Sequence, residues 1–588
     1  MITSIQYFLI LLFSFTILSA QTVVPDEWKT LCEKTSYKET SSYAGSMEYF
    51  KKLADNSPYA KFVKFGNSPQ GRDLMLLIVS KEGAFDPVSA KETRKPIILI
   101  ENGIHAGEIE GKDASMIMLR EMLITKEKEY LLDNVILLVI PIFSVDSHER
   151  TSPYNRINQN GPTNMGWRTT STNYNLNRDF VKADAPEMRA WLKMYNEWIP
   201  DFFIDCHTTD GLDLQYTVTY TVEKFRNIPP ATSKWVTEEY EPFMKRKVEE
   251  QGYLMAPYIW FKNYNMTDGL LDYVTPPMLS TGYVGLQSRP GLLIETHSLK
   301  PYKERVHATQ AILESSLELF NKQYEELVSL NNSADMWNIE NYLEKKKFFP
   351  VLFDYSPEID SFLFKGIKWN ETESWITGTP VKEYNGEPFE ITIPHIHQSV
   401  VTDSVKVPFA YLIPQEWKKV VEVLDLHGIE HEVLKTNEIL DVARKKFANV
   451  KFDAMPYDGR FKPAFEIINY QENVEVPEGT IIVKTNQRRL PLIMYLLEPI
   501  SDDSFVKWGF FNTIFVRTEY FELYSMLPVA NEMVKVNPEL KTEFLKWLKE
   551  HPEVESNPRD RMRWFYEKSP YYDETHNVYP VLRVEEKF

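Results

Sequence analysis

The chain has 588 residues, of which 43% are hydrophobic and 26% are charged, so its composition is that of a globular protein with more than one domain. Its formal net charge of −18 and its lack of a basic stripe argue against a nucleic-acid partner. The only two cysteines, Cys32 and Cys206, are far apart in the sequence, and we expect both to be free thiols.

An apolar run at residues 8–18 lies at the start of the chain and is followed by the small residues Ser19 and Ala20. The run is too short for a membrane span and ends in a pattern typical of a cleavage site, so residues 1–20 are predicted to be a signal peptide. No cysteine follows before Cys32, which argues against a lipid anchor. We therefore expect a secreted or periplasmic protein whose mature chain has no transmembrane anchor.

The first half of the chain alternates between strand and helix patterns. Short apolar runs predict buried strands at residues 96–100, 135–140, 202–204 and 292–294. Apolar residues at helical spacing predict helices at 110–124, 184–198 and 302–330. This alternation predicts an α/β fold with a mostly parallel or mixed central sheet flanked by helices.

The polar stretch at residues 331–335 is predicted to end the last of these helices, and we place a domain boundary there. The remaining residues, 336–588, are expected to form an α+β or β-rich accessory domain of unknown function. Its predicted elements are strands at 389–393 and 481–483, turns at Asn385-Gly386 and Asp458-Gly459, and helices at 415–426 and 540–549.

The sharpest local signal is His105-x-x-Glu108, which lies where the strand near 96–102 gives way to the next helix. Ligands of open parallel sheets bind beyond the carboxyl ends of the strands. His207 stands at the carboxyl end of another strand, and Asp205 points to the same side of that strand. His105, Glu108 and His207 would together supply three zinc ligands and leave one position open, as a catalytic zinc site requires.

A second copy of the motif, His427-Gly-Ile-Glu430, is followed by His431 and spells H-x-x-E-H, which some zinc proteases carry on one continuous helix. Here Gly428 follows a helical pattern and is predicted to end it. The side chains of this copy are therefore not expected to share a face, and we interpret it as structural.

Glu295 lies in an apolar strand pattern, where an ionised carboxylate is costly unless it has a partner or a task. Beside a metal site it would be a general base, and the alternative is a salt bridge to a neighbouring Lys or Arg. Arg168 and Arg178 follow the strand at 135–145 in a polar segment. Guanidinium groups there would stabilise an anion or a developing oxyanion, although most loop arginines are simply solvated.

In this order, His105-x-x-Glu108, Asn177-Arg178-Asp179-Phe180, His207 and Glu295 resemble the zinc carboxypeptidase family of the carboxypeptidase A type. The resemblance covers roughly residues 40–330 and implies that the domain predicted at 21–335 is catalytic and holds one zinc ion through His105, Glu108 and His207. It implies that Glu295 activates the attacking water and that Arg168 polarises the scissile carbonyl. It also implies that Asn177 and Arg178 hold the terminal carboxylate of a peptide or protein substrate.

Two further positions follow from the same resemblance. The family often has Asp two residues before the Asn-Arg pair, where it supports the first zinc histidine, and here that position is Asn175. A neutral amide can still accept the hydrogen bond but makes the histidine less basic. The family also has a mobile tyrosine upstream of the catalytic glutamate, for which Tyr273 and Tyr283 are both candidates.

The sequence thus predicts an exported zinc carboxypeptidase that removes the C-terminal residue of peptides. One alternative is a carboxypeptidase or amidase that acts on muropeptides with the same scaffold. Another is a catalytically inactive peptide-binding homologue. The loss of Glu295 or of a metal ligand would indicate such a homologue, and all four positions are filled.

Overall fold

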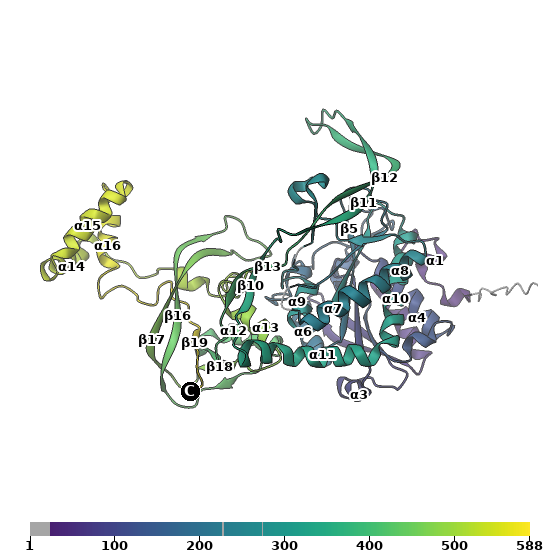
Figure 1. Ribbon diagram of the computed structural model, residues 1–588, viewed down its shortest axis with the longest axis horizontal. Helices are drawn as coiled ribbons and strands as arrows, with labels where there is room; N and C mark the ends of the chain where they lie inside the picture. Colours follow the sequence, from purple (N-terminus) through teal and green to yellow (C-terminus); the bar gives the residue numbers. More distant parts are fainter. Residues whose placement is uncertain (1–23, 226–227, 273) are drawn as a thin grey trace, which may run out of the picture.

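The structure is a computed structural model that describes residues 24–225, 228–272 and 274–588. The predicted signal peptide lies outside the described residues. Figure 1 shows an α/β body built from the first half of the chain, with the C-terminal half beside it. Three helices near the C-terminus are set apart from both and are α14 (Leu523–Val536), α15 (Glu539–Glu550) and α16 (Pro558–Tyr566).

The body is organised around a mixed sheet of eight strands. In sheet order these are β1 (Ala60–Asn67), β2 (Asp73–Val79), β4 (Ile136–Ile140), β3 (Ile97–Asn102), β5 (Phe202–Thr209), β9 (Gly291–His297), β6 (Val218–Val222) and β7 (Met255–Pro257). The four central strands β4, β3, β5 and β9 run parallel. β1 and β2 pair antiparallel to their neighbours, whereas β6 pairs antiparallel to β9 and parallel to β7. The four predicted strands and the mixed α/β fold are confirmed.

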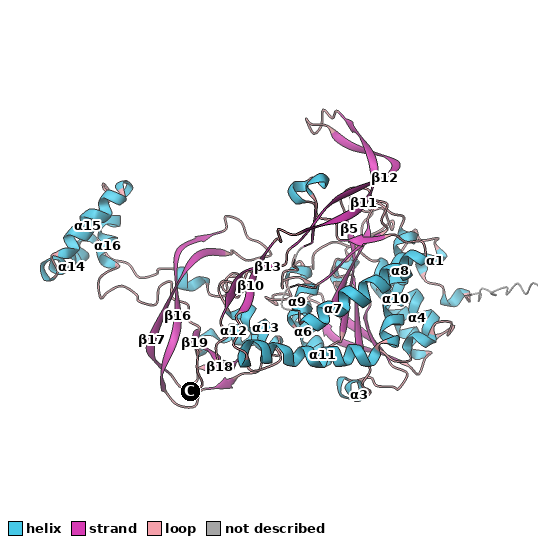
Figure 2. Cartoon of the chain, viewed as in Figure 1, coloured by secondary structure: helices cyan, strands magenta, loops and turns pink. Residues whose placement is uncertain are grey.

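Helices cover both faces of this sheet, as Figure 2 shows. Successive residues of β3 point to opposite faces, so Ile98 and Ile100 belong to one hydrophobic cluster and Ile97 and Leu99 to the other. The first face packs against α2 (Tyr43–Asp55), α4 (Glu110–Leu123), α8 (Glu241–Glu250) and α10 (Tyr302–Lys322). The second packs against α6 (Pro186–Trp198) and α9 (Ser280–Leu286). Shorter helices of this half are α1 (Leu31–Lys34), α3 (Pro87–Glu92), α5 (Val145–Glu149) and α7 (Pro230–Trp235).

The predicted helix end at 331–335 is wrong. The helical pattern breaks earlier, at Gln323, and α11 (Tyr324–Asn338) runs through the polar stretch. Asn331 is fully buried and donates through Nδ2 to the backbone oxygen of Asp201 at 2.9 Å. Asp335 pairs with Arg289 at 2.8 Å. Asn331 and Asp335 thus bond to distant residues. Bonds to their own nearby backbone, which would favour the end of a helix, are not needed.

The remaining strands form three further groups, of which two lie within the C-terminal half and one joins strands of that half to β8 of the first half. A six-stranded sheet has the order β15 (Glu432–Val433), β18 (Ile481–Lys484), β14 (Ala410–Ile413), β19 (Leu582–Val584), β16 (Glu438–Phe452) and β17 (Pro463–Val476). The other groups are β10 (Phe349–Asp354) with β13 (Val400–Val405), and β11 (Ile359–Thr372) with β12 (Val381–His397) and β8 (Leu270–Asp272). Helices α12 (Lys418–Leu426) and α13 (Leu490–Leu497) pack in the same half. This mixture agrees with the predicted α+β or β-rich character.

The two predicted turns have different outcomes. Asp458 and Gly459 both have positive φ, 44° and 79°, and form the tight turn between β16 and β17 as predicted. Asn385-Gly386 does not form a turn. It lies within β12, where the register with β11 shifts between Ile367 and Trp369, so its Gly386 (φ 81°) belongs to a β-bulge.

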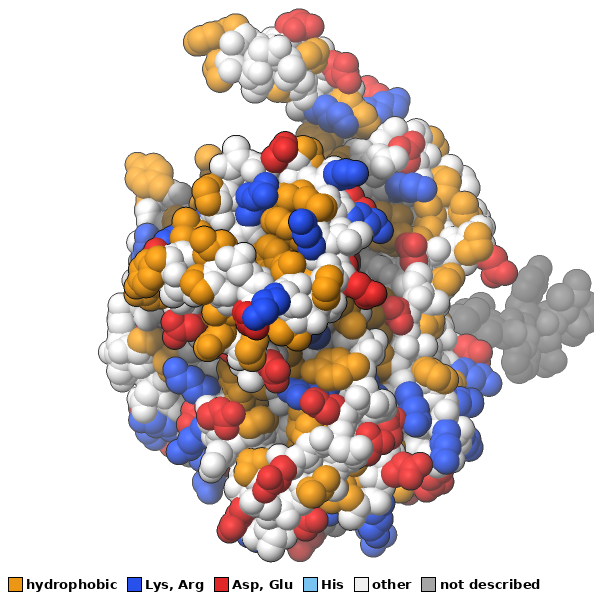
Figure 3. Space-filling model, turned by 90° about the vertical axis from the view of Figure 1, so that its left-hand side faces the viewer, with side chains coloured by type: hydrophobic (Ala, Val, Ile, Leu, Met, Phe, Trp, Pro, Cys, Tyr) orange, Lys and Arg blue, Asp and Glu red, His pale blue; other side chains and the backbone are white. Residues whose placement is uncertain are grey.

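The two halves of the chain share one hydrophobic core. Phe180 and Tyr283 of the first half belong to the same cluster as Tyr411, Leu490 and Trp508 of the second. Both cysteines are buried and free, as expected. Among the residues described, no helix combines the length and the apolar character needed to cross a membrane. Figure 3 shows the end that carries α14–α16, where acidic and basic side chains are interspersed.

Candidate metal centre and substrate cleft

The candidate site lies at the carboxyl ends of β3, β5 and β9, which are parallel neighbours in the sheet. His105 and Glu108 occupy the short connection between β3 and α4. His207 lies near the end of β5, and the register places it directly opposite Glu295 of β9. Parallel strands therefore bring together four side chains that the sequence separates by up to 190 positions.

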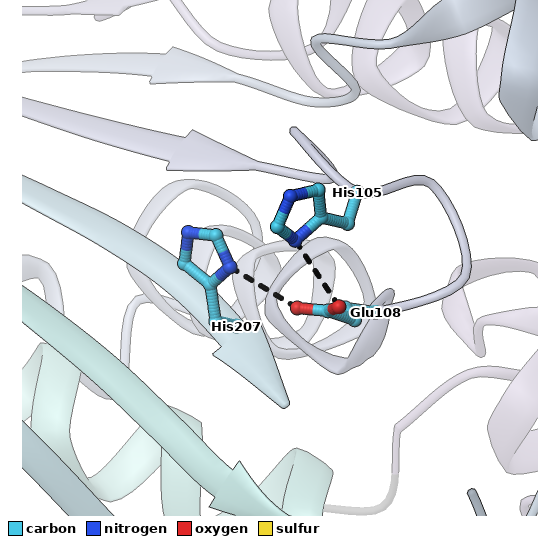
Figure 4. Close-up of side chains that lie close together, drawn as sticks. All are labelled: His105, Glu108 and His207. Carbon is cyan, nitrogen blue, oxygen red and sulfur yellow. Dashed lines mark hydrogen bonds and ion pairs between the residues drawn. The ribbon is translucent and has the colours of Figure 1, made fainter. Parts of the chain in front are cut away.

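His105, Glu108 and His207 offer ligand atoms that all lie within 4.8 Å of one another (Figure 4). Nδ1 of His105 is 3.1 Å from Oε1 of Glu108, and Nδ1 of His207 is 3.1 Å from Oε2 of the same carboxylate. All three side chains are at most 3% exposed. Two imidazoles and a carboxylate that converge on one point form a suitable ligand set for zinc.

The outer nitrogens of both imidazoles have partners that suit metal binding. Nε2 of His105 lies 3.0 Å from Oδ1 of Asn175, and Nε2 of His207 lies 2.8 Å from Oδ2 of Asp205. When Nε2 carries the proton and donates to these oxygens, Nδ1 keeps its lone pair for a metal ion. Asp205 is itself fixed, because Ser280 Oγ donates to it at 2.6 Å. The residues present therefore fit a zinc ion.

Burial and charge set the protonation of this group. Burial lowers the pKa of His105 to about 4, which keeps it neutral, the form that binds metal. Burial would raise the pKa of Glu108, but His105 and Arg156 hold it well below its usual range. Burial likewise opposes protonation of His207, but the carboxylate of Asp205 raises its pKa well above the usual value. A bound cation would oppose that proton directly.

A cleft of about 560 Å³ opens over these ligands. Its lining includes the three ligands together with Glu295, Arg168, Asn177 and Arg178. Burial raises the pKa of Glu295 to about 8, with His207 acting in the opposite direction. The salt-bridge alternative for Glu295 finds no support, because none of the lysines and arginines that the structure describes forms an ion pair with it. The structure thus brings together in one cleft all the predicted site residues that it describes except Tyr283.

Of the two tyrosine candidates, Tyr283 does not reach the cleft. Tyr283 is fully buried in the core, where its hydroxyl lies 3.0 Å from Nδ1 of His427, so its assignment to the substrate site is corrected. It belongs to α9, whose buried face carries it away from the strand ends. Tyr273 lies outside the described residues. The tyrosine that does line the described cleft is Tyr258, which directly follows β7.

Arg156 is a second cleft residue that the sequence analysis missed. Its Nη2 lies 2.6 Å from Oε1 of Glu108, closer than Nη1 of Arg168 at 3.3 Å. A Cβ at Gly107 would lie 2.5 Å from the Cγ of Arg156, so this approach requires a glycine there. Neither Arg156 nor Tyr258 lies in a periodic or motif-bearing stretch, so no local signal distinguishes them.

Two other histidine groups have structural explanations. In the second H-x-x-E copy, α12 ends at Leu426, Gly428 has φ 66° and His427 is buried, as predicted for a structural motif. A second potential ligand group comprises Asp272, His395 and His397. The ammonium group of Lys224 already lies beside it, with Nζ 3.9 Å from Asp272 Oδ2. The two ring nitrogens of His397 pair with Asp272 and Asp360. We assign no metal to it.

Comparison with known proteins agrees with this geometry. Residues 46–277 match the sequence model of the family described as zinc carboxypeptidase. Carboxypeptidase 2 of Trichophyton rubrum is 23% identical over 482 residues, which cover 78% of this chain and 82% of the relative. Carboxypeptidase 2 of Trichophyton equinum is 24% identical over 480 residues with the same coverage. The solved metallo-carboxypeptidase of Burkholderia cenocepacia has 16% identity and a TM-score of 0.35, over 47% of this chain and 69% of that one.

Residues 46–277 match a zinc carboxypeptidase domain and the similar fungal proteins are carboxypeptidases, so the chain is a metallocarboxypeptidase, an enzyme class that acts on peptide substrates. The family match includes His105, Glu108 and His207 and ends before Glu295. The fungal relatives match 78% of the chain, a share that residues 1–335 cannot contain. Their similarity therefore extends into the C-terminal half, which the expected resemblance over 40–330 left out.

Proposed function

We propose that this enzyme removes the C-terminal residue of peptides or proteins, with one zinc ion held by His105, Glu108 and His207. The observation that carries the proposal is the convergence of these three side chains beneath a cleft that Glu295 and Arg178 also line. When bound there, zinc supplies a Lewis acid that polarises a carbonyl and lowers the pKa of a water molecule to about 7.

The residues around the ligands divide the remaining work. Glu295 lies opposite His207 on the adjacent strand and accepts a proton from the attacking water, then delivers it to the leaving amine. Arg168, whose side chain is 45% exposed into the cleft, donates hydrogen bonds to the scissile carbonyl oxygen as negative charge develops on it. Asn177 and Arg178 hold the terminal carboxylate, and the guanidinium fork matches its geometry.

Three further proposals complete this assignment. Residues 21–335 form the catalytic part of the chain and residues 336–588 an accessory part. The protein is exported with the help of residues 1–20. Its substrate is a peptide or protein C-terminus, and the muropeptide alternative is an outcome that substrate profiling would reveal.

Replacement of one ligand tests the metal assignment. His207→Ala should lose both zinc and activity, because the two remaining ligands cannot close the site. The matched control is His431→Ala in the second H-x-x-E copy, which should keep both, since His431 is half-buried and pairs with Asp425 at 2.9 Å. Metal analysis and peptide turnover measure the two variants. Full zinc occupancy in His207→Ala would show that the ligand assignment is wrong.

A further inference from the structure

The hairpin of β16 and β17, in the C-terminal half, contacts Arg178, a residue that lines the substrate cleft. Its tip spans residues 453–462 and turns at Asp458-Gly459, where Tyr457 and Arg460 pair across the turn. The hydroxyl of Tyr457 accepts a hydrogen bond from Nε of Arg178 at 3.0 Å. These two residues are 279 positions apart in the sequence. A residue of the accessory half therefore contacts the proposed carboxylate-binding arginine directly.

This contact helps to fix the guanidinium of Arg178. Its Nε donates to Tyr457, and its Nη1 donates to the backbone oxygen of Asn177 at 2.6 Å. Within the described part of the chain, Nη2 has no hydrogen-bond partner. A long arginine side chain loses rotamer freedom when it binds a ligand, and bonds that hold it in place beforehand reduce that loss. Nε and one hydrogen of Nη1 are thus held, while the second hydrogen of Nη1 and both hydrogens of Nη2 remain for a carboxylate.

The tip itself is anchored to the catalytic half. Arg460 forms a bidentate ion pair with Asp184, through Nε at 3.0 Å and through Nη2. The ring of Tyr457 stacks on Trp508 with their centroids 6.0 Å apart, and Trp508 is fully buried in the shared core. Partly buried, bidentate pairs of this kind hold their geometry better than exposed ones. The position of Tyr457 is therefore set by the core that both halves build.

The C-terminal half also contacts the segment that directly precedes Leu279, another residue of the cleft lining. Nε1 of Trp508 donates to Asp503 at 3.1 Å, and the other carboxylate oxygen of Asp503 accepts from the backbone nitrogen of Met278 at 2.9 Å. Met278 directly precedes Leu279, which lines the cleft. Two separate contacts thus connect the C-terminal half to the end of the cleft where Arg178 lies.

We propose that Tyr457, at the β16–β17 tip, is a positioning residue that orients Arg178 for the substrate's terminal carboxylate. This inference rests on the proposed function. It gives the accessory half a role in substrate recognition.

Tyr457→Phe removes the hydroxyl and keeps the stacked ring. For a peptide with a free C-terminus, we expect KM to rise about tenfold with kcat nearly unchanged, the size expected for one hydrogen bond to a charged group. Cleavage of the C-terminally amidated peptide, zinc content and melting temperature should not change. The matched control is Tyr470→Phe on β17 of the same hairpin, which should behave like the unmodified enzyme.

Arg178→Met separates the failure of this inference from the failure of the proposed function. If Arg178→Met raises KM for the free acid while Tyr457→Phe matches Tyr470→Phe, the role of Tyr457 is wrong and the proposed function stands. If Tyr457→Phe instead lowers zinc content or kcat without a change in KM, its role is structural and the inference is likewise overturned. Equal cleavage of acid and amide by the unmodified enzyme would overturn both proposals.

Discussion

His105 and His207 differ in the side chain that supports each of them. Asp205, a carboxylate, lies behind His207, whereas Asn175, a neutral amide, lies behind His105. A carboxylate makes an imidazole more basic and a stronger ligand than an amide does. Both partners orient the ring that they contact. The site therefore combines a more basic histidine, His207, and a less basic one, His105, with the carboxylate of Glu108, whose pKa His105 and Arg156 lower.

Glu295→Gln separates binding from chemistry at the level of one residue. Glu295 is not one of the three ligands, so the variant should keep its zinc and its KM while kcat falls about a hundred- to ten-thousandfold, the range for loss of a general base. Steady-state kinetics and metal analysis provide the measurement.

Glu304→Gln is the control for Glu295→Gln. Glu304 accepts a hydrogen bond from Thr217 at 2.8 Å and does not line the cleft, so this variant should retain turnover. Near-normal turnover of Glu295→Gln itself would mean that another group is the base.

Residues at strand ends could be located from the sequence, whereas residues in loops could not. His207 and Glu295 each interrupt an apolar strand, and His105-x-x-Glu108 follows another, so a local pattern marks all four. Arg156 and Tyr258 lie in segments where an arginine or a tyrosine is unremarkable in sequence. Only the folded structure brings them to Glu108 and to the cleft.

Helices and strands were predictable where periodic apolar residues set them, and less so where polar residues have distant partners. α4 and α6 begin and end within two residues of their predicted limits. α11 continues through 331–335 because partners from elsewhere in the chain bind its asparagines and aspartate. Those partners lie up to 153 positions away, as for Asp335 and Arg488, beyond the reach of any local pattern.

The first turn of α6 contains a buried carboxylate that makes stability depend on pH. Glu187 is fully buried, and burial raises its pKa from 4.5 to about 7. Because the folded state binds the proton more tightly, this group contributes most stability below about pH 4.5 and loses it as pH rises through about 7. Glu187→Gln should therefore stabilise the protein at pH 8, by on the order of 2 kcal/mol, and have little effect at pH 4.5.

Urea unfolding at the two pH values measures this effect. Glu197→Gln lies in the same helix on an exposed position and is the matched control, for which we expect no pH-dependent difference. A Glu187→Gln variant that is equally stable relative to the unmodified protein at both pH values would contradict the assigned cause.

At the scale of the whole molecule, the two halves are less separate than the predicted domain boundary at residues 331–335 indicates. They share one hydrophobic cluster, and Tyr457 and Asp503 of the second half contact the cleft region of the first. The sequence could place the metal site in the first half because its motifs are local. It could not predict these contacts, because they join residues more than 220 positions apart.

The central claim is that the enzyme recognises a free C-terminal carboxylate through Arg178. The most direct test compares turnover of two peptides that differ only in a C-terminal acid or amide, in the unmodified enzyme and in Arg178→Met. Arg189→Met is the matched control, since Arg189 lies in α6 and does not line the cleft.

The unmodified enzyme and Arg189→Met should cleave the acid and largely ignore the amide. Arg178→Met should remove most of this difference by slowing cleavage of the acid, with zinc content unchanged, because a charged bidentate contact is lost. Equal cleavage of acid and amide by the unmodified enzyme would contradict the carboxypeptidase mechanism and favour an amidase or endopeptidase that uses the same metal centre.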